Sequence, residues 1–383
     1  MPAQQEKIIF IIQRVGVGGA EFFLKTIVNS FIARGIEPIL ILLSDDNPIL
    51  NQFDPGIRLY VVPRRYRYDF SVSKRIREIV LTEGVCKVFC IGAFAFFMAK
   101  LRLLQHTNIA FYLSLHTTVP FTFKNYVMDT LYLRLLGSND TAIFICKNQK
   151  DYYRSKYYFK AKKSFVIYNG IDTSHYFANN LSKYTYREDT RLTFKIPADA
   201  KVIVNVANVK PEKGHIYAIE ALSILHEKLN NKAHLLIVGE AKKEAFESLK
   251  QSIVERKLMD YVHFAGIQED VRPYLAAADI FTLTSFSETF SLAAIEAMSF
   301  GLPCVLTDVG GAAEMIVENK NGLLCEARNP LSIANSWHKM LNSKVDNTYI
   351  MELAAGRFSA EQMIDNYLEV LVGEGQKLIA EET

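Results

Sequence analysis

The segment SFSETFSLAAIEAMSFGLPCVLTDVG, residues 285–310, decides the fold because it predicts a loop, a helix and a strand in succession. Its central part LAAIEAM, residues 292–298, is rich in the strong helix formers Ala, Leu, Met and Glu. Gly301 and Pro303 are expected to end that helix. The following PCVLTD is apolar without alternation, which predicts a buried strand of a parallel sheet.

Two glutamates flank the start of this predicted helix, Glu288 in the loop and Glu296 inside the helix. The first N–H groups of a helix lack intrahelical partners, and the helix dipole adds positive charge there. Such an end can hold a phosphate, and a carboxylate on each side would bind hydroxyls that flank a diphosphate. The alternative is structural, with Glu288 capping the helix and Glu296 solvated, and the spacing alone supports both interpretations equally.

The remaining chain predicts an α/β protein with two domains, which suits its 383 residues. Strands and helices alternate from KIIFIIQ (7–13) to SFVIYNGID (164–172), and a second series begins at KVIVNVANV (201–209). The alternation predicts two Rossmann-like doubly wound domains, joined by a polar linker over 174–197. We place the domains at 1–175 and 176–358, and an amphipathic terminal helix at 359–383.

Composition excludes several classes of protein. The net charge of +3 gives no nucleic-acid signature, and five scattered cysteines without a C-x-x-C pair suggest neither zinc nor a disulfide framework. The N-terminus lacks the pattern of a signal peptide, and no run of about 18 apolar residues exists. We therefore expect a cytoplasmic protein.

Two basic and aromatic stretches stand out, PRRYRYDFSVSKR (63–75) and KDYYRSKYYFKAKK (150–163). Such clusters suit binding to the anionic face of a membrane or stacking on nucleic-acid bases. They also suit helices with a solvated basic face and a buried aromatic face. The membrane hypothesis assigns peripheral association to their cations, namely Arg64, Arg65, Arg67, Lys156, Lys160, Lys162 and Lys163.

Further polar residues fall at predicted carboxyl ends of strands, where doubly wound sheets bind ligands. His116 ends IAFYLSLH, Lys213 lies in the turn NVKPEKGH, and Gly266 ends VHFAG. A lysine there can neutralise a departing diphosphate. The structural alternatives are a histidine bonded to backbone and an ordinary surface lysine. No D-x-D triplet occurs, so we expect no metal-held diphosphate.

Over nearly its whole length the chain resembles the GT-B glycosyltransferases of the large retaining family 4. The resemblance rests on the pair Glu288 and Glu296 and on the segments GGAE (18–21), VIYNGID (166–172), PEKG (211–214), LLIVGE (235–240) and LPCVLTDVGGAAEMI (302–316). It implies two domains facing a central cleft, with the terminal helix crossing back onto the first domain.

The resemblance also implies an activity and the residues that perform it. The activity is retaining, metal-independent and cofactor-free transfer from a UDP- or GDP-sugar to a glycan or lipid-linked acceptor in surface polysaccharide assembly. Glu288 would meet the donor sugar, Lys213 would offset the departing diphosphate, and His116 would lie by the sugar. The implied donor-binding residues near the diphosphate are Gly18, Gly19, Asn208, Thr289, Phe290, Ser291 and Leu292, of which Gly18 and Gly19 also lie near the acceptor. Gly266 and Ile267 would line the base, and Glu296 would hold the ribose.

Three positions depart from the family pattern. Asn208 stands where the family usually has an arginine, which removes a bidentate grip on the diphosphate. Thr289 and Ser291 replace two glycines and place side chains near the phosphate. Arg272 is a candidate for the missing charge. Two alternatives to the transferase therefore stay open: a non-catalytic partner protein that keeps the fold, and a nucleotide-sugar epimerase or phosphorolytic enzyme.

Overall fold

The structure is a computed structural model that describes residues 6–16, 18–66, 68–116, 123–157, 161, 163–176, 180–230 and 232–373. The chain forms two compact units, and each is described by itself below. Unit 1 contains the chain up to Asn169 together with the residues from Met363 onward, and unit 2 contains Gly170–Gln362.

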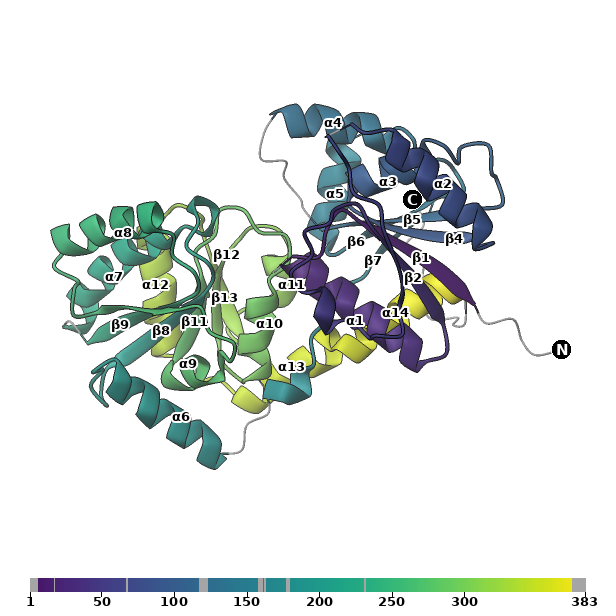
Figure 1. Cartoon of the computed structure of the whole chain (residues 1–383). Coiled ribbons are helices and arrows are strands. Elements are labelled where there is room, and N and C mark those ends of the chain that lie inside the picture. The colour runs from purple at the N-terminus through teal and green to yellow at the C-terminus, as the bar shows by residue number, and fades with distance from the viewer. Residues whose placement is uncertain are drawn as a thin grey trace. The chain divides into compact units, whose positions relative to one another are not determined.

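Unit 1 is built on a seven-stranded parallel sheet with the order β3-β2-β1-β4-β5-β6-β7 (Figure 1). The strands are β1 (Lys7–Ile12), β2 (Glu37–Leu42), β3 (Arg58–Val61), β4 (Lys87–Ile91), β5 (Ala110–Leu115), β6 (Thr141–Phe144) and β7 (Lys163–Val166). The helices are α1 (Gly19–Ala33), α2 (Ser71–Thr82), α3 (Ala93–Lys100), α4 (Phe123–Leu133), α5 (Lys147–Lys156) and most of α14 (Ala360–Val372), with a 3₁₀ turn at Leu50–Gln52.

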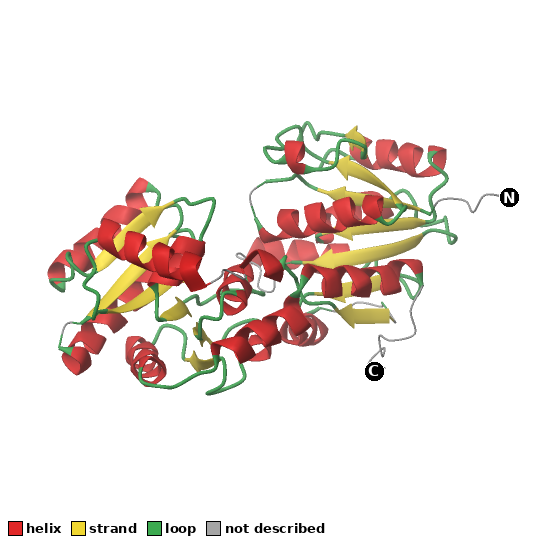
Figure 2. Ribbon diagram, turned by 90° about the horizontal axis from the view of Figure 1, so that it is seen from below, coloured by secondary structure: helices red, strands yellow, loops and turns green. Residues whose placement is uncertain are grey.

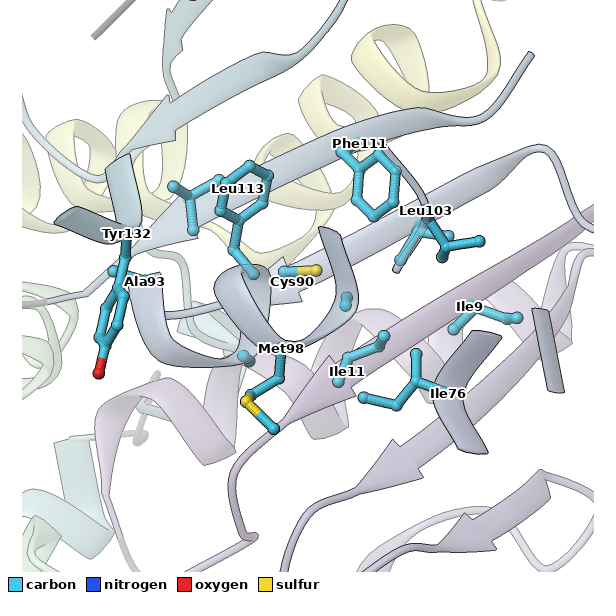
Figure 3. Close-up of a cluster of buried hydrophobic side chains, with 14 of the residues drawn as sticks. Ile9, Ile11, Ile76, Cys90, Ala93, Met98, Leu103, Phe111, Leu113 and Tyr132 are labelled. Carbon is cyan, nitrogen blue, oxygen red and sulfur yellow. The ribbon is translucent and has the colours of Figure 1, made fainter. Parts of the chain in front are cut away.

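The apolar strands of unit 1 are covered on both faces, as their unbroken hydrophobicity predicts. Ile9 and Ile11 of β1 point to the face where α2 and α3 pack, and Figure 3 shows them with Ile76 and Met98. Phe10 points to the opposite face and meets Phe31 of α1, with ring centroids 5.9 Å apart. Successive side chains of one strand therefore serve two separate cores.

The C-terminal helix α14 completes the second of these cores. The ring of Tyr367 packs on Phe23 of α1 and Phe89 of β4, with centroid distances of 5.0 and 5.8 Å. Arg34 Nη1 donates to Asp365 Oδ1 at 2.6 Å at the end of α1. The end of the described chain is thus part of the first sheet's packing.

Unit 2 has a six-stranded parallel sheet with the order β10-β9-β8-β11-β12-β13. Figure 2 shows strands of this sheet in yellow with helices packed around them in red. The strands are β8 (Lys201–Val206), β9 (Ala233–Val238), β10 (Val262–Gly266), β11 (Ile280–Leu283), β12 (Cys304–Thr307) and β13 (Gly322–Cys325). The helices are α6 (Asn180–Thr193), α7 (His215–Leu229), α8 (Lys243–Glu255), α9 (Arg272–Ala277), α10 (Leu292–Ser299), α11 (Ala312–Met315), α12 (Pro330–Leu341) and α13 (Asn347–Phe358), with 3₁₀ turns η2 (Thr173–Tyr176) and η3 (Pro211–Lys213).

Two groups of helices cover the second sheet. Helix α7 packs against α8 and α12, and their apolar side chains form one cluster around the fully buried Trp337. Trp337 Nε1 donates to Thr282 Oγ1 of β11 at 3.0 Å. Helix α6 packs on α9, and α10 packs on α13. The prediction of two Rossmann-like doubly wound domains is confirmed.

The predicted linker over 174–197 is wrong, because most of it forms α6. Arg191 is buried and donates to the Ala277 carbonyl at 3.0 Å and to Asp279 Oδ2 at 3.2 Å. Arg187 donates to the carbonyls of Ala276 and Ala278, both at 3.1 Å. The two guanidinium groups thereby satisfy the carbonyls at the end of α9, which a helix leaves without intrahelical partners.

The strand predicted over 164–172 ends at Val166. Beyond it Ile171 forms an isolated parallel bridge with Ser359. Gly170 lies so close to that segment that an added Cβ would stand 2.2 Å from the Ser359 carbonyl oxygen. This segment therefore packs against the end of α13 and leaves the sheet.

Candidate functional site

The strand order of unit 2 reverses between β8 and β11, which are neighbours in the sheet (Figure 1). Doubly wound sheets bind ligands at such a point, outside the carboxyl ends of the strands. Lys213 lies in η3 just after β8, and Glu288 lies in the loop that follows β11. The fold therefore places both predicted residues at the switch point.

Lys213 and Glu288 form an ion pair there, with Lys213 Nζ 2.5 Å from Glu288 Oε2. Their side chains are 25% and 22% exposed, so the pair is accessible from one side. Glu288 does not cap α10, because Ser291 does: its Oγ accepts from the Ala294 N–H at 3.2 Å. The structural alternative for Glu288 is therefore wrong.

Two glycines allow the loops at the switch point to approach each other closely. Gly214 has a φ of +65°, and an added Cβ would lie 2.1 Å from the Thr284 carbonyl oxygen. Gly310 has a φ of +56°, and an added Cβ would lie 2.1 Å from the Glu288 carbonyl oxygen. Only glycine fits such positions without strain. Both glycines lie in sequence motifs, PEKG (211–214) and LPCVLTDVGGAAEMI (302–316), that gave no sign of this role.

Helix α10 presents its N-terminus at the same place. No acceptor among the described residues takes the N–H groups of Ser291, Leu292 and Ala293. The Ser291 hydroxyl turns back to cap the helix, while the Phe290 ring is buried against Phe358, with centroids 5.6 Å apart. The backbone donors and the helix dipole together suit an anionic group such as phosphate.

Glu296 on α10 is half-buried. Burial raises the pKa of its carboxyl group to about 7, although a hydrogen bond from the Tyr176 side chain acts in the opposite direction. Glu296 is therefore not the solvated residue of the structural alternative. Tyr176 was missed by sequence reasoning, because it lies in η2 within the stretch assigned to the linker and carries no motif.

Asn208 follows β8, and its Oδ1 accepts from the Glu240 N–H at 2.8 Å. It lines a cavity of about 690 Å³ together with Tyr217 and Phe286. The side chain that stands where the family has an arginine thus joins the ends of β8 and β9.

Arg272 does not supply the missing charge. Its Nε and Nη2 donate to the two carboxylate oxygens of Asp270 at 2.9 and 2.8 Å, and Nη1 donates to the His175 carbonyl. Gly266 ends β10 with a φ of +71°, and Ile267 after it is 71% exposed. The exposed apolar side chain of Ile267 therefore lies at the carboxyl end of β10.

The predicted residues of unit 1 gather around α1. Gly18 is the N-cap of α1 and Gly19 its first residue, and both are exposed. His116 follows β5, and its ring lies 4.7 Å from the Phe23 ring of α1, measured between centroids. His116 Nε2 is 3.0 Å from Ser114 Oγ, and burial lowers the pKa of the imidazole to about 4, so it is neutral at pH 7.

The predicted membrane cations lie in different surroundings. Arg65, Lys156 and Lys163 are exposed, whereas the Arg64 guanidinium lies over the Phe94 ring at 4.6 Å from its centroid. Arg67, Lys160 and Lys162 lie outside the described residues. No helix in the described part of the chain combines the length and the apolar character needed to span a membrane.

Two Rossmann-like units of this kind match the fold of solved glycosyltransferases of the GT-B class. Comparisons assign the family. Residues 187–372 match the family described as glycosyl transferases group 1, and residues 17–175 match glycosyltransferase family 4. The chain is a glycosyltransferase and belongs to the family 4 type.

Relatives and solved structures agree with this assignment. An uncharacterised glycosyltransferase of Haemophilus influenzae is 26% identical over 345 residues, covering 88% of this chain and 91% of that protein. An Escherichia coli UDP-Gal:alpha-D-GlcNAc-diphosphoundecaprenol alpha-1,3-galactosyltransferase is 24% identical, covering 81% of each chain. The structure of Anabaena HepE in complex with UDP is similar in fold, with a TM-score of 0.80, 20% identity and coverage of 96% and 100%.

Proposed function

We propose that the protein is a retaining, metal-independent glycosyltransferase that takes its sugar from a UDP- or GDP-sugar. The observation that carries this proposal is the Lys213–Glu288 ion pair at the switch point, beside the open N-terminus of α10. Positive charge from Lys213 and from the helix end would replace a metal at the diphosphate. The UDP and UDP-glucose complexes of Anabaena HepE support a nucleotide-sugar donor.

The ion pair suggests an order of events on donor binding. The diphosphate would meet the N–H groups of Ser291, Leu292 and Ala293 and would compete with Glu288 for the Lys213 ammonium group. Glu288 would then be released to accept hydrogen bonds from donor sugar hydroxyls, while Glu296 would hold the ribose. Lys213 and the helix end would stabilise the charge of the departing diphosphate, where such stabilisation lowers the barrier most.

The acceptor hydroxyl would attack from the face that the diphosphate leaves and would pass its proton to the departing diphosphate oxygen, which gives retention without a protein base. His116 is neutral, so it would exchange a hydrogen bond with a sugar hydroxyl without adding charge. We assign His116 and the exposed glycines Gly18 and Gly19 to the side that meets the sugar and the acceptor. Gly266 and Ile267 would border the base.

We propose a glycan or lipid-linked acceptor in surface polysaccharide assembly, at the cytoplasmic face of a membrane. The Escherichia coli relative named for a diphosphoundecaprenol acceptor supports this. Charge supports it too: unit 1, residues 1–169 and 363–383, contains 24 Lys and Arg against 17 Asp and Glu, whereas residues 170–362 contain 20 against 24. A basic first unit would be attracted to anionic headgroups, which Arg65, Lys156 and Lys163 are exposed to meet.

The test is a thermal-shift and turnover assay with UDP, GDP and their sugars, in EDTA. A nucleotide at 100 times its dissociation constant should stabilise the protein by about 2.7 kcal/mol. Lys213→Met should weaken that binding at least tenfold, whereas Asp151→Asn, an exposed change on α5, should not. The anomeric configuration of the released or transferred sugar, followed by proton NMR, should match that of the donor.

Four outcomes would refute parts of the proposal. Absence of nucleotide binding in the wild type would favour the non-catalytic partner protein. That alternative was raised because Asn208 stands where the family usually has an arginine. Epimerised donor without any acceptor would favour the epimerase. Turnover that EDTA abolishes and Mg²⁺ restores would refute metal independence, and inversion at the anomeric carbon would refute retention.

A further inference from the structure

Unit 1 contains a cavity of about 430 Å³ at the carboxyl ends of β1, β2 and β3, bounded by α3 and α4. Its volume is within the range of small-molecule pockets. All of its lining residues belong to unit 1. Those that carry the argument are Gln13, Asp45, Arg64, Tyr66, Asp129 and Tyr132.

The lining contains carboxylates that have no partner. Asp129 on α4 is half-buried, and no described residue forms a hydrogen bond or an ion pair with its carboxylate. Burial raises the pKa of this group to about 6. Asp45 and Gln13 likewise make no side-chain hydrogen bond with a described residue. A half-buried acceptor without a donor is costly, so the pocket is suited to a ligand that brings hydroxyl groups.

Aromatic rings complete the lining. The Tyr66 side chain is 64% exposed, and Phe94 presents a ring that carries the Arg64 guanidinium on one face. Figure 3 shows Tyr132 at the edge of the buried cluster, away from Ile9. Carboxylates beside the exposed Tyr66 ring match a sugar ring, which has hydroxyls at its rim and apolar C–H groups on its faces.

Charge argues against a phosphate in this pocket. Among the described lining residues Arg64 is the one cation, and the lining also contains the two carboxylates of Asp45 and Asp129. A phosphate would meet repulsion from both carboxylates, whereas an uncharged sugar would find hydrogen-bond acceptors. The exposed cations of unit 1, such as Arg65, lie on its outer surface.

We infer that this pocket is the acceptor subsite and takes an uncharged, hydroxylated sugar ring, with Asp129 as a specificity-determining residue. The inference rests on the proposed transferase function. Any phosphate of a lipid-linked acceptor then remains outside the pocket, at the basic surface. The protein selects its acceptor by sugar hydroxyls within unit 1.

The test uses the full chain and saturation-transfer difference NMR. The probes are methyl glycosides of glucose, galactose and N-acetylglucosamine, with glucose 6-phosphate and galactose 6-phosphate as charged counterparts. At least one glycoside should bind the wild type and should bind Asp129→Asn at least tenfold more weakly. Asp151→Asn makes the same chemical change on the exposed face of α5 and should bind like the wild type.

Two controls separate folding and donor binding from this result. Asp129→Asn should unfold at the same temperature as the wild type or higher, because it removes a carboxylate without a partner. Its UDP and GDP binding should equal that of the wild type. The inference is overturned if Asp129→Asn binds the glycosides normally, if the hexose phosphates bind as well as the glycosides, or if no glycoside binds. Loss of nucleotide binding in the wild type would instead refute the donor assignment.

Discussion

Replacing Gly214 by alanine should destabilise unit 2 by about 2–5 kcal/mol. Gly214 has a φ of +65°, and an added Cβ would lie 2.1 Å from the Thr284 carbonyl oxygen. The left-handed backbone costs alanine about 1–2 kcal/mol, and relief of an overpacked contact costs about 1–3 kcal/mol more. The sum is a large part of the roughly 5–15 kcal/mol that stabilises a typical domain.

Gly266→Ala is the matched control for this change. Gly266 has a similar φ of +71°, but nothing lies within 4 Å of its added Cβ. It should cost only the conformational part, about 1–2 kcal/mol. The difference between the two variants therefore isolates the contact between the turn after β8 and the end of β11.

The single tryptophan, Trp337, makes the measurement specific to unit 2, because it is buried in α12 and bonded to β11. Urea unfolding followed by its fluorescence gives the loss of unfolding free energy for each variant. Gly214→Ala should also weaken UDP or GDP binding, since Lys213 adjoins it. The reasoning is refuted if Gly214→Ala is no less stable than Gly266→Ala.

Three further changes test other contacts of unit 2. Tyr176→Phe removes a hydrogen bond that lowers the pKa of Glu296, so this pKa should rise above about 7. The pH midpoint of nucleotide binding should then move upward, and an unchanged midpoint would contradict the contact between Tyr176 and Glu296. Burial lowers the pKa of His234 to about 4, against 6.5 when unfolded. Between these values the unfolded chain binds more protons at this residue, so His234 should contribute a fall in unfolding free energy of up to about 3 kcal/mol from pH 6.5 to 4. His234→Asn should remove that part of the slope in urea titrations. Arg191→Leu should lower the same free energy by about 3 kcal/mol, because the α9 carbonyls and Asp279 lose a buried partner. A loss below that of Arg256→Leu, which removes a half-buried arginine paired with Glu220, would contradict this.

The alternation of strands and helices was predictable because both sheets are parallel and covered on both faces. Segments such as KIIFIIQ and PCVLTD are apolar throughout, and glycine or proline marks their ends. The position of Glu288 in a loop and Glu296 in a helix follows from local propensity alone. Local chemistry thus predicted the elements and the positions of these two glutamates on them.

Features that depend on a distant partner were not predictable. The polar composition of 174–197 favoured a linker, yet Arg187 and Arg191 hold α6 against carbonyls that lie far away in sequence. Arg272 was a candidate for free charge, but its contact with Asp270 neutralises it. The contact of Tyr176 with Glu296 likewise depends on how η2 packs on α10.

The roles of Gly214 and Gly310 show the same limit. Glycine in a turn is expected wherever the backbone reverses, so neither position was distinctive in the sequence. Only the packing of two loops shows that a methyl group there would meet a carbonyl oxygen at 2.1 Å. Their importance comes from the approach of neighbouring loops and not from the turns themselves.

The most direct test of the central claim is calorimetric titration of UDP and GDP into the wild type, Lys213→Met, Glu296→Gln and Asp151→Asn, with EDTA present. If Lys213, the α10 N-terminus and Glu296 together bind the nucleotide, one nucleotide should bind the wild type and Asp151→Asn equally. It should bind Lys213→Met and Glu296→Gln at least tenfold more weakly. Equal affinity for all four proteins, or binding that requires added metal, would contradict it.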